Sequence, residues 1–100
     1  MTGATVVITG TFADGYEAHF AEYSKRVRDF LSKHGGTVVR RQRVSKLLEG
    51  EPADLVMLID FPSAEVASTI FGSPEYQAIL PLRARVFRRF TMLLAAAGEV

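Results

Sequence analysis

The segment DLVMLIDFP, from Asp54 to Pro62, restricts the possible folds of this chain more than any other stretch. Its aliphatic residues indicate a β-strand, whose successive side chains point to opposite faces of a sheet. Both alternating sets of positions are apolar until Asp60, so both faces of the predicted strand must be covered. A chain of 100 residues has enough material for one layer of helices on one face. The second face therefore needs a cover from outside the chain.

Three further strands are predicted from β-branched or apolar runs next to turn residues. They cover residues 4–12, 37–50 and 90–97, and the turn GEP joins the second of them to the Asp54 strand as a hairpin. Apolar residues at three- and four-residue spacing predict a helix after the first strand. Asp14 and Glu17 form a capping-box pattern at the start of this helix, and Gly35 suits its C-terminal cap.

A second helical region is predicted after the third strand. Ser63 can cap a short helix that runs to Phe71, and Ser73 can cap another helix that has Pro74 at its first position. Pro81 predicts a kink or a new helix start within this region, because proline lacks the amide hydrogen that a helix interior needs. The resulting order is strand, helix, strand, strand, helix, strand.

This order predicts a single α+β domain over residues 1–100, with the ferredoxin-like βαββαβ fold and a four-stranded antiparallel sheet. Both helices should cover the same face, because such crossovers are right-handed. Alternation along the strands sorts the side chains into two sets. The bulkier set is assigned to the helix-covered face: Val6, Ile8, Phe12, Leu55, Met57, Ile59, Phe61, Phe90, Met92 and Leu94. The second face takes Val7, Thr9, Thr11, Val56, Leu58, Asp60, Thr91, Leu93 and Ala95.

The second face is too apolar to remain in water. Its four larger aliphatic side chains, Val7, Val56, Leu58 and Leu93, would each forgo about 1.5–3 kcal/mol of burial if they were left exposed. A second copy of the same sheet is the simplest cover, and threonines with Asp60 supply the polar fraction that is usual in an interface. The sequence therefore predicts a homodimer in which two sheets pack face to face.

Composition argues against several kinds of site. The chain has no cysteine, which removes disulfides, thiolate catalysis and cysteine-based metal centres and fits a reducing compartment. Its two histidines, His19 and His34, are far apart in sequence and lack accompanying carboxylates, so we expect no metal site. We expect no cofactor either, because the glycine pair that begins at Gly35 ends a helix and so cannot cradle phosphate.

Charge and hydropathy limit the partners. The net charge is +1, and the arginines gather in two short runs, at residues 40–43 and 83–89, that we interpret as solvated faces. Nucleic-acid binding usually needs a broader basic surface, so we expect no nucleic-acid partner. The first ten residues have neither a basic segment nor a long apolar run, which predicts no signal peptide and no membrane partner. The expected location is cytoplasmic.

The segment IDFPSAEVASTIFGSPEYQAILPLR, from Ile59 to Arg83, resembles the domain of unknown function family 1330. Sequences of this family typically have an acidic residue, then Phe-Pro-Ser, then Ser-Pro-Glu-Tyr, and an arginine a few residues later. HGGTVVRR and LLEG match further family segments, so the likeness extends over nearly the whole chain. The resemblance implies a dimeric α/β barrel of ferredoxin-like subunits. Its wider superfamily includes muconolactone isomerases and cofactor-free monooxygenases, which work in a cleft between helices and sheet.

The resemblance can be carried over at five positions. Arg41, Glu49, Asp60, Tyr76 and Arg83 fall on polar positions of the family pattern. The sequence departs from that pattern after Arg41, where a glycine is common and this chain has glutamine, and near the hairpin, where EPAD replaces a segment with tryptophan and a basic residue. A pocket at that end can therefore differ in shape and charge from those of relatives.

Two classes of function remain open. The first is a cofactor-free isomerase, cyclase or monooxygenase that acts on a small enolisable or aromatic metabolite, in which a basic side chain moves a proton and an arginine stabilises the enolate. The second is a non-catalytic dimer that binds a small molecule or serves as an accessory protein. The fold alone favours neither, because ferredoxin-like subunits support many functions.

Candidate site residues follow from the hypothesis of a cleft between the first helix and the sheet. Its apolar walls would come from Phe20, Met57 and Phe90. His19 is the candidate catalytic proton carrier, because imidazole titrates nearest to neutrality, and Tyr23 and Arg41 are candidate substrate-binding residues. The alternative is a filled core, with His19 on the wet flank of the helix and Arg41 paired to Asp60.

Three further residues have both a functional and a structural interpretation. Asp60 is a second catalytic candidate as a general base. Alternatively, it forms an ion pair with Arg41 or Arg43, because the hairpin would place Gln42 or Arg43 opposite it. Tyr76 and Arg83 are candidate substrate-binding residues. Capping of a helix start explains the residues around Tyr76 equally well, and a surface carboxylate could satisfy Arg83.

Overall fold

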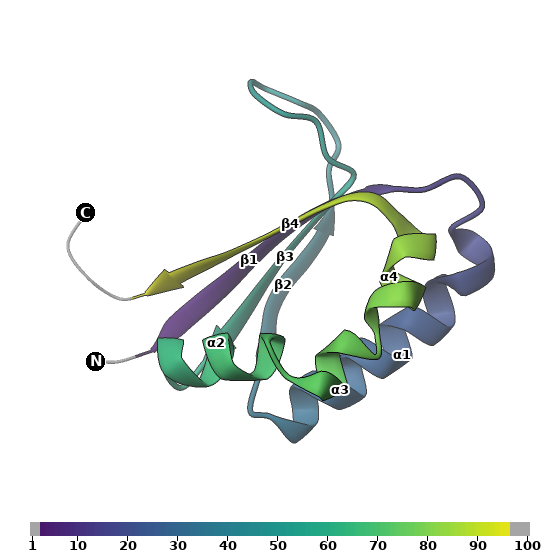
Figure 1. The fold of residues 1–100 in the computed structure, drawn as a ribbon. Helices are drawn as coiled ribbons and strands as arrows, with labels where there is room; N and C mark the ends of the chain where they lie inside the picture. The colour runs from purple at the N-terminus through teal and green to yellow at the C-terminus, as the bar shows by residue number, and fades with distance from the viewer. Residues whose placement is uncertain (1–2, 97–100) are drawn as a thin grey trace.

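The computed structural model describes residues 3–96 and has the predicted ferredoxin-like α+β fold. Along the chain it contains β1 (Ala4–Phe12), α1 (Glu17–Lys33), β2 (Thr37–Arg43), β3 (Leu55–Phe61), α2 (Ala64–Phe71), α3 (Pro74–Gln77), α4 (Leu80–Val86) and β4 (Phe87–Ala96). The strands form one antiparallel sheet in the order β2-β3-β1-β4, and the helices lie on one face of it (Figure 1). The molecule is thin, with Cα extents of 40 × 34 × 18 Å.

Caps in the second helical region confirm the sequence prediction. The hydroxyl of Ser63 accepts a hydrogen bond from the Val66 amide, and the hydroxyl of Ser73 accepts one from the Tyr76 amide, so each satisfies an orphan donor of a helix start. Pro81 lies in the first turn of α4, where its missing amide hydrogen costs nothing. The region is therefore split into three short helices.

Three predicted boundaries were wrong. The helix α1 begins at Glu17 without a side-chain cap, because the turn before it places Tyr16 so that its ring stacks on Phe12 at 4.0 Å, and this packing prevails over a capping box. The strand β2 ends at Arg43, since an exposed loop follows it. The strand β4 begins three residues early, at Phe87, because its pairing with β1 continues past a bulge. The prediction for residue 97 lies outside the described residues.

The strand register confirms how the side chains divide between the two faces. Val6 pairs with Ile59 and with Leu94, whereas its neighbour Val7 pairs with Leu58 and Leu93. Residues of the first kind form the core with α1 and α2; Ile59 is 0% exposed. The exception is Leu94, which is 45% exposed although it faces the helix side.

The other side of the sheet, here called the open face, is covered by no element within residues 3–96 (Figure 1). It carries Thr5, Val7, Thr9, Val56, Leu58, Asp60 and Leu93. Val7, Val56 and Leu58 are half-buried by their neighbours in the sheet, and Leu93 is 58% exposed. The apolar patch predicted from the sequence is therefore present and uncovered in the single chain.

A one-residue bulge in β2 decides which of its arginines face the helices. Val38 pairs with Ile59 and Arg40 pairs with Leu58, so the residue between them is extra. In a regular strand, Val38 and Arg41 would lie on opposite faces, because they are three residues apart. The bulge puts both on the helix side, since Arg41 pairs with Met57.

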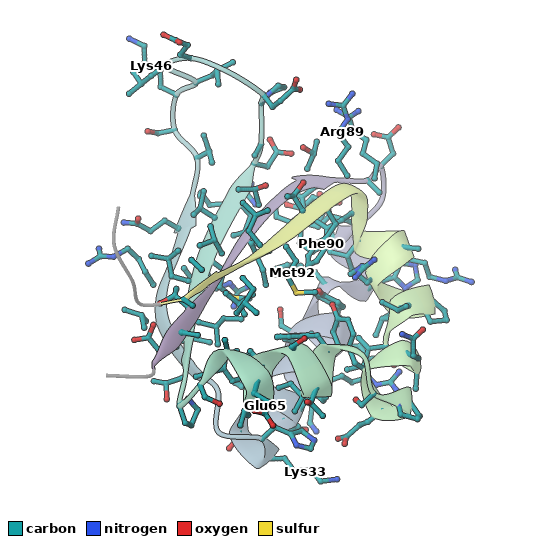
Figure 2. All side chains as sticks on the ribbon, turned by 60° about the vertical axis from the view of Figure 1, so that its left-hand side comes forward. Lys33, Lys46, Glu65, Arg89, Phe90 and Met92 are labelled. Carbon is teal, nitrogen blue, oxygen red and sulfur yellow. The ribbon has the colours of Figure 1, made fainter. Side chains whose placement is uncertain are left out.

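The loop of residues 44–54 projects from the end of the sheet (Figure 1). Val44 still donates a backbone hydrogen bond to Asp54, at 2.8 Å, and the loop beyond this pair is mostly exposed. Glu49, one of the positions carried over from the family pattern, lies in this loop. Figure 2 shows Lys46 at its outer end. Within residues 3–96, none of the helices is long and apolar enough to cross a membrane.

The end of α1 is joined to the start of α3 by a carboxylate between two basic groups. Nε2 of His34 lies 2.8 Å from Oε1 of Glu75, and Nζ of Lys33 lies 3.5 Å from Oε2. The hydrogen bond from His34, followed by the charge of Lys33, lowers the pKa of the Glu75 carboxyl.

We expect Glu75→Gln to lower the free energy of unfolding at neutral pH and to have little effect in acid. A carboxyl whose pKa is lower when folded contributes stability above its unfolded pKa, about 4.3, and loses it as the pH falls through the folded pKa. Urea unfolding between pH 7 and pH 3 measures the difference from wild type. Glu22→Gln is the control, because Glu22 is exposed and forms no ion pair within residues 3–96. A difference that is constant with pH contradicts this account.

Candidate functional site

A cavity of about 200 Å³ lies between α1 and the sheet. All four strands contribute to its lining. Its apolar walls include Ile8, Leu31, Leu55, Met57, Phe87 and Phe90, and its polar residues are Tyr23, Ser24, Arg28 and Arg41. Figure 2 shows Phe90 extending from β4 into the space between the sheet and the helices. A mostly apolar cavity with a few converging polar groups is typical of a small-molecule site.

The exposure of the lining residues shows where the cavity opens. Arg28 on α1 and Val38 and Arg41 on β2 are exposed, whereas Ile8 and Leu55 are buried. The entrance therefore lies between α1 and β2, and we call it the mouth. The buried lining residues come from α1, from the central strands and from β4, and they form the floor: Ile8, Tyr23, Leu31, Leu55 and Phe87.

Arg41 is held at the mouth by contacts with uncharged groups. Its guanidinium lies over the ring of Phe20, with Cζ 5.1 Å from the ring centroid, and donates a long hydrogen bond of 3.4 Å to Oγ of Ser24. Among residues 3–96, no carboxylate lies within 4.0 Å of it. A cation–π contact orients a guanidinium and leaves most of its donors available. Arg41 can therefore bind an anion.

Tyr23 supplies a neutral hydroxyl at the floor. It is 8% exposed, and its ring packs edge-on against Phe87 with centroids 5.7 Å apart. Burial, with a smaller contribution from Tyr76, raises the pKa of the Tyr23 hydroxyl well above its ordinary value, although Arg83 and Arg41 act in the opposite direction. The group is therefore protonated at physiological pH and can donate a hydrogen bond.

Tyr76 and Arg83 lie next to this site and do not line the cavity. Arg83 donates a hydrogen bond of 3.1 Å to the Tyr76 hydroxyl, and its Cζ lies 4.4 Å from the centroid of Phe90. Phe90 is a wall of the cavity. The pair therefore supports Phe90 from behind, which places these two predicted substrate-binding residues in a second layer.

The structure does not bring His19 or Asp60 to the cavity. His19 is half-buried on α1 and is not part of the lining. Asp60 is exposed on the open face, where it pairs with Thr37 and accepts a hydrogen bond of 2.7 Å from the hydroxyl of Thr5. The predicted ion pair between Asp60 and Arg41 or Arg43 was wrong, because both arginines face the helices, as the pairing of Arg43 with Leu55 shows. The catalytic roles of His19 and Asp60 stay predictions.

Ser24 and Arg28 were missed by the sequence prediction. They are four residues apart, so they lie on one face of α1, next to the apolar stripe. Because Arg41 was assigned to the cleft between the first helix and the sheet, this spacing could have indicated that Ser24 and Arg28 line the same cleft. Over residues 3–96, no group of three or more histidines and carboxylates is close enough to hold a metal ion.

The model of the domain of unknown function DUF1330 matches residues 5–97 of this chain. The chain belongs to the DUF1330 family. No curated protein sequence matches this DUF1330 protein. Its fold is shared with solved structures of low sequence identity, and such similarity shows the fold alone.

Three of these structures illustrate the range. Hydroxynitrile lyase from Passiflora edulis is 7% identical with a TM-score of 0.78, over 99% of this DUF1330 chain and 96% of the lyase. SnoaB, a cofactor-independent oxygenase from Streptomyces nogalater, is 17% identical with a TM-score of 0.67, over 100% of this chain and 97% of SnoaB. A dimeric ferredoxin-like protein of unknown function from Thermobifida fusca is 10% identical with a TM-score of 0.67, over 95% of this chain and 91% of the Thermobifida protein.

Proposed function

We propose that this DUF1330 protein is a cofactor-independent isomerase, cyclase or monooxygenase that acts on a small enolisable or aromatic molecule in the cavity between α1 and the sheet. One observation carries the proposal: an apolar cavity contains a guanidinium that no carboxylate of residues 3–96 neutralises, together with a buried, neutral tyrosine hydroxyl. Hydroxynitrile lyase and a cofactor-independent oxygenase have the same fold, which is compatible with this class of chemistry.

The proposed chemistry depends on stabilising a negative charge that forms on the substrate. Arg41 would bind the enolate or phenolate oxygen, and the Tyr23 hydroxyl would donate a hydrogen bond to an oxygen at the floor. Arg41 is exposed at the mouth, so its attraction for this oxygen would be strengthened where the bound substrate and the apolar walls exclude water. His19, four residues before Tyr23 on α1, is the proposed proton acceptor and would exchange its proton with the substrate through water.

A second candidate function is binding without catalysis. It is favoured by the lining itself, because within residues 3–96 the cavity has no imidazole and no carboxylate among its walls. A protein of this kind would hold a small anion and return it unchanged. Chromatography of a bound ligand after prolonged incubation in air and under argon separates the two: chemical change supports the enzyme, and full recovery supports the binding protein.

We also propose that two copies pack through their open faces as a homodimer. The proposal is supported by the uncovered aliphatic patch around Leu58 and by the dimeric state of the ferredoxin-like protein from Thermobifida fusca. Burial of Val7, Val56, Leu58 and Leu93 in both copies would provide the apolar centre of such an interface. Asp60 and Thr5, hydrogen-bonded at one end of the open face, would lie in this interface and not in the cavity.

The site can be tested by thermal shift with a library of aromatic, lactone and enolisable acids. A ligand at about 100 times its dissociation constant adds about 2.7 kcal/mol of stability, which raises the melting temperature of a domain of this size by roughly 11–22 °C. We expect Arg41→Ala and Tyr23→Phe each to remove most of that shift. Arg85→Ala is the control, because Arg85 is exposed on α4 and does not line the cavity. Ligands that stabilise all four proteins equally would place the site elsewhere.

A further inference from the structure

We infer that the ligand of the cavity is a single-ring carboxylate, or an acid of similar size, bound with its carboxylate at the mouth between Arg28 and Arg41 and its ring on the floor. This inference names a ligand class for the cavity and so rests on the proposed function above. Its two parts, the charge at the mouth and the size of the floor, come from separate observations.

Two arginines line the mouth. Arg28 comes from α1 and Arg41 from β2, and both line the same cavity. Ser24 lies one turn before Arg28, and its hydroxyl already accepts a hydrogen bond from Arg41, so the three side chains share the entrance. In the described part of the chain, neither arginine has a carboxylate within 4.0 Å. An anion that lies between the two side chains would be attracted by both positive charges.

The pattern of contacts around Arg41 suits a carboxylate. The ring of Phe20 occupies one face of the guanidinium plane, which leaves the edge donors for a planar acceptor. Carboxylates match two parallel N–H donors of an arginine and bind them in a fork. Because both arginines are exposed, their charges cost little to maintain before the ligand arrives. The mouth is thus prepared for one carboxylate and rejects cations.

The floor sets the size and the orientation. An apolar cavity of about 150 Å³ is large enough for benzene, and this cavity has a volume of about 200 Å³. One six-membered ring with a few further atoms therefore fits, and three fused rings do not. A carboxylate turned inward would lie against Ile8, Leu55 and Phe87, which are buried and apolar, and the neutral Tyr23 hydroxyl of the floor could donate a hydrogen bond to it without compensating its charge. The acid must therefore remain at the mouth.

Isothermal titration calorimetry with benzoate, benzamide and anthracene-9-carboxylate tests both parts. We expect benzoate to bind, benzamide to bind at least about tenfold more weakly because it lacks the charge, and anthracene-9-carboxylate not to bind. Arg28→Gln and Arg41→Gln keep a side chain of moderate length and should each weaken benzoate about tenfold. Arg26→Gln is the matched control, because Arg26 is exposed on the same helix and does not line this cavity, so its affinity should equal that of wild type.

Each result decides between the inference and the broader proposal. Equal affinities for benzoate and benzamide, or an unchanged affinity in Arg28→Gln, would overturn the position of the carboxylate. Binding of anthracene-9-carboxylate that Tyr23→Phe weakens would overturn the size limit and keep the cavity as a functional site. If none of the three probes binds but a library compound does so in a Tyr23-dependent manner, the ligand class is wrong and the proposed function stands. If nothing binds at all, both are overturned.

Discussion

Replacement of Phe61 by alanine is expected to lower the free energy of unfolding by about 3–5 kcal/mol, the usual cost of removing a buried aromatic ring. Phe61 is 3% exposed on the helix side of β3, and its ring packs edge-on against Phe71 with centroids 5.7 Å apart. Urea unfolding at a fixed protomer concentration measures the change, because stability depends on concentration if the protein dimerises. Leu48→Ala is the control and should change stability by less than about 0.5 kcal/mol, since Leu48 is 87% exposed.

The same ring explains why the chain has glycine at position 36. A Cβ at Gly36 would lie 2.9 Å from two atoms of the Phe61 ring, which is too close for an ordinary contact. Gly36→Ala should therefore destabilise the wild type and be better tolerated once Phe61 is alanine, so the two changes should not be additive. A loss of under 1 kcal/mol in Phe61→Ala would mean that the ring does not anchor this core.

Leu58→Asp is expected to convert a dimer into a folded monomer. Leu58 lies on the open face, between Val7 of β1 and Arg40 of β2. In the proposed dimer, the substitution would place an unpaired charge in an apolar interface, which costs several kcal/mol. In the monomer, the same aspartate lies on an exposed face opposite Arg40, so the fold should survive. Sedimentation equilibrium reports the mass, and circular dichroism reports the fold.

Val66→Asp provides the matched control for this experiment. It introduces the same charge at an exposed position in the first turn of α2, on the helix side of the molecule, where an acid is well tolerated. We expect this variant to sediment like wild type. A wild type that sediments as a monomer at micromolar concentration, or a Leu58→Asp protein that remains a dimer, would contradict the proposed assembly.

Much of the fold follows from local patterns in the sequence. Ser63 and Ser73 predict the two helix starts because a hydroxyl at a cap acts on amides two or three residues away, and no distant contact is involved. The parity of β1 and β3 predicts the two faces because both strands are regular and their side chains alternate without interruption. The dimer hypothesis has the same origin, since it depends on apolar residues such as Leu58 on the face away from the helices.

The failed predictions all depend on how side chains pack and strands pair, which local sequence patterns do not determine. The start of α1 depends on the stacking of Tyr16 on Phe12, which local capping rules do not include. The orientation of Arg41 depends on the bulge after Val38, and a single extra residue in a strand leaves no reliable sequence signal. Asp60 was placed opposite the wrong residues because the prediction centred the hairpin on the turn GEP. Arg43 pairs with Leu55, so the hairpin is centred earlier in the sequence and Asp60 pairs with Thr37.

The candidate site could be predicted in part. The walls Phe20, Met57 and Phe90 line the cavity, as do Tyr23 and Arg41, because the apolar stripe of α1 must face the buried side of the sheet. Arg28 was missed because an arginine beside the apolar stripe of a helix is usually exposed to solvent and has no role in a site. Only the position of β2 under α1 makes it part of the mouth. The placement of His19 outside the lining could not be foreseen from helical spacing alone.

Because the molecule is one helical layer on one sheet, 18 Å across its thinnest axis, it has a single core, and the cavity is part of that core. Ile8, Leu55 and Phe87 serve both as floor and as core residues. Substitutions that enlarge the floor for a larger ligand would therefore lower the free energy of unfolding, whereas changes of charge at the mouth would not. Evolution of new ligand preferences in such a chain should begin with the mouth arginines, and should reach the floor only after stabilising substitutions have accumulated elsewhere.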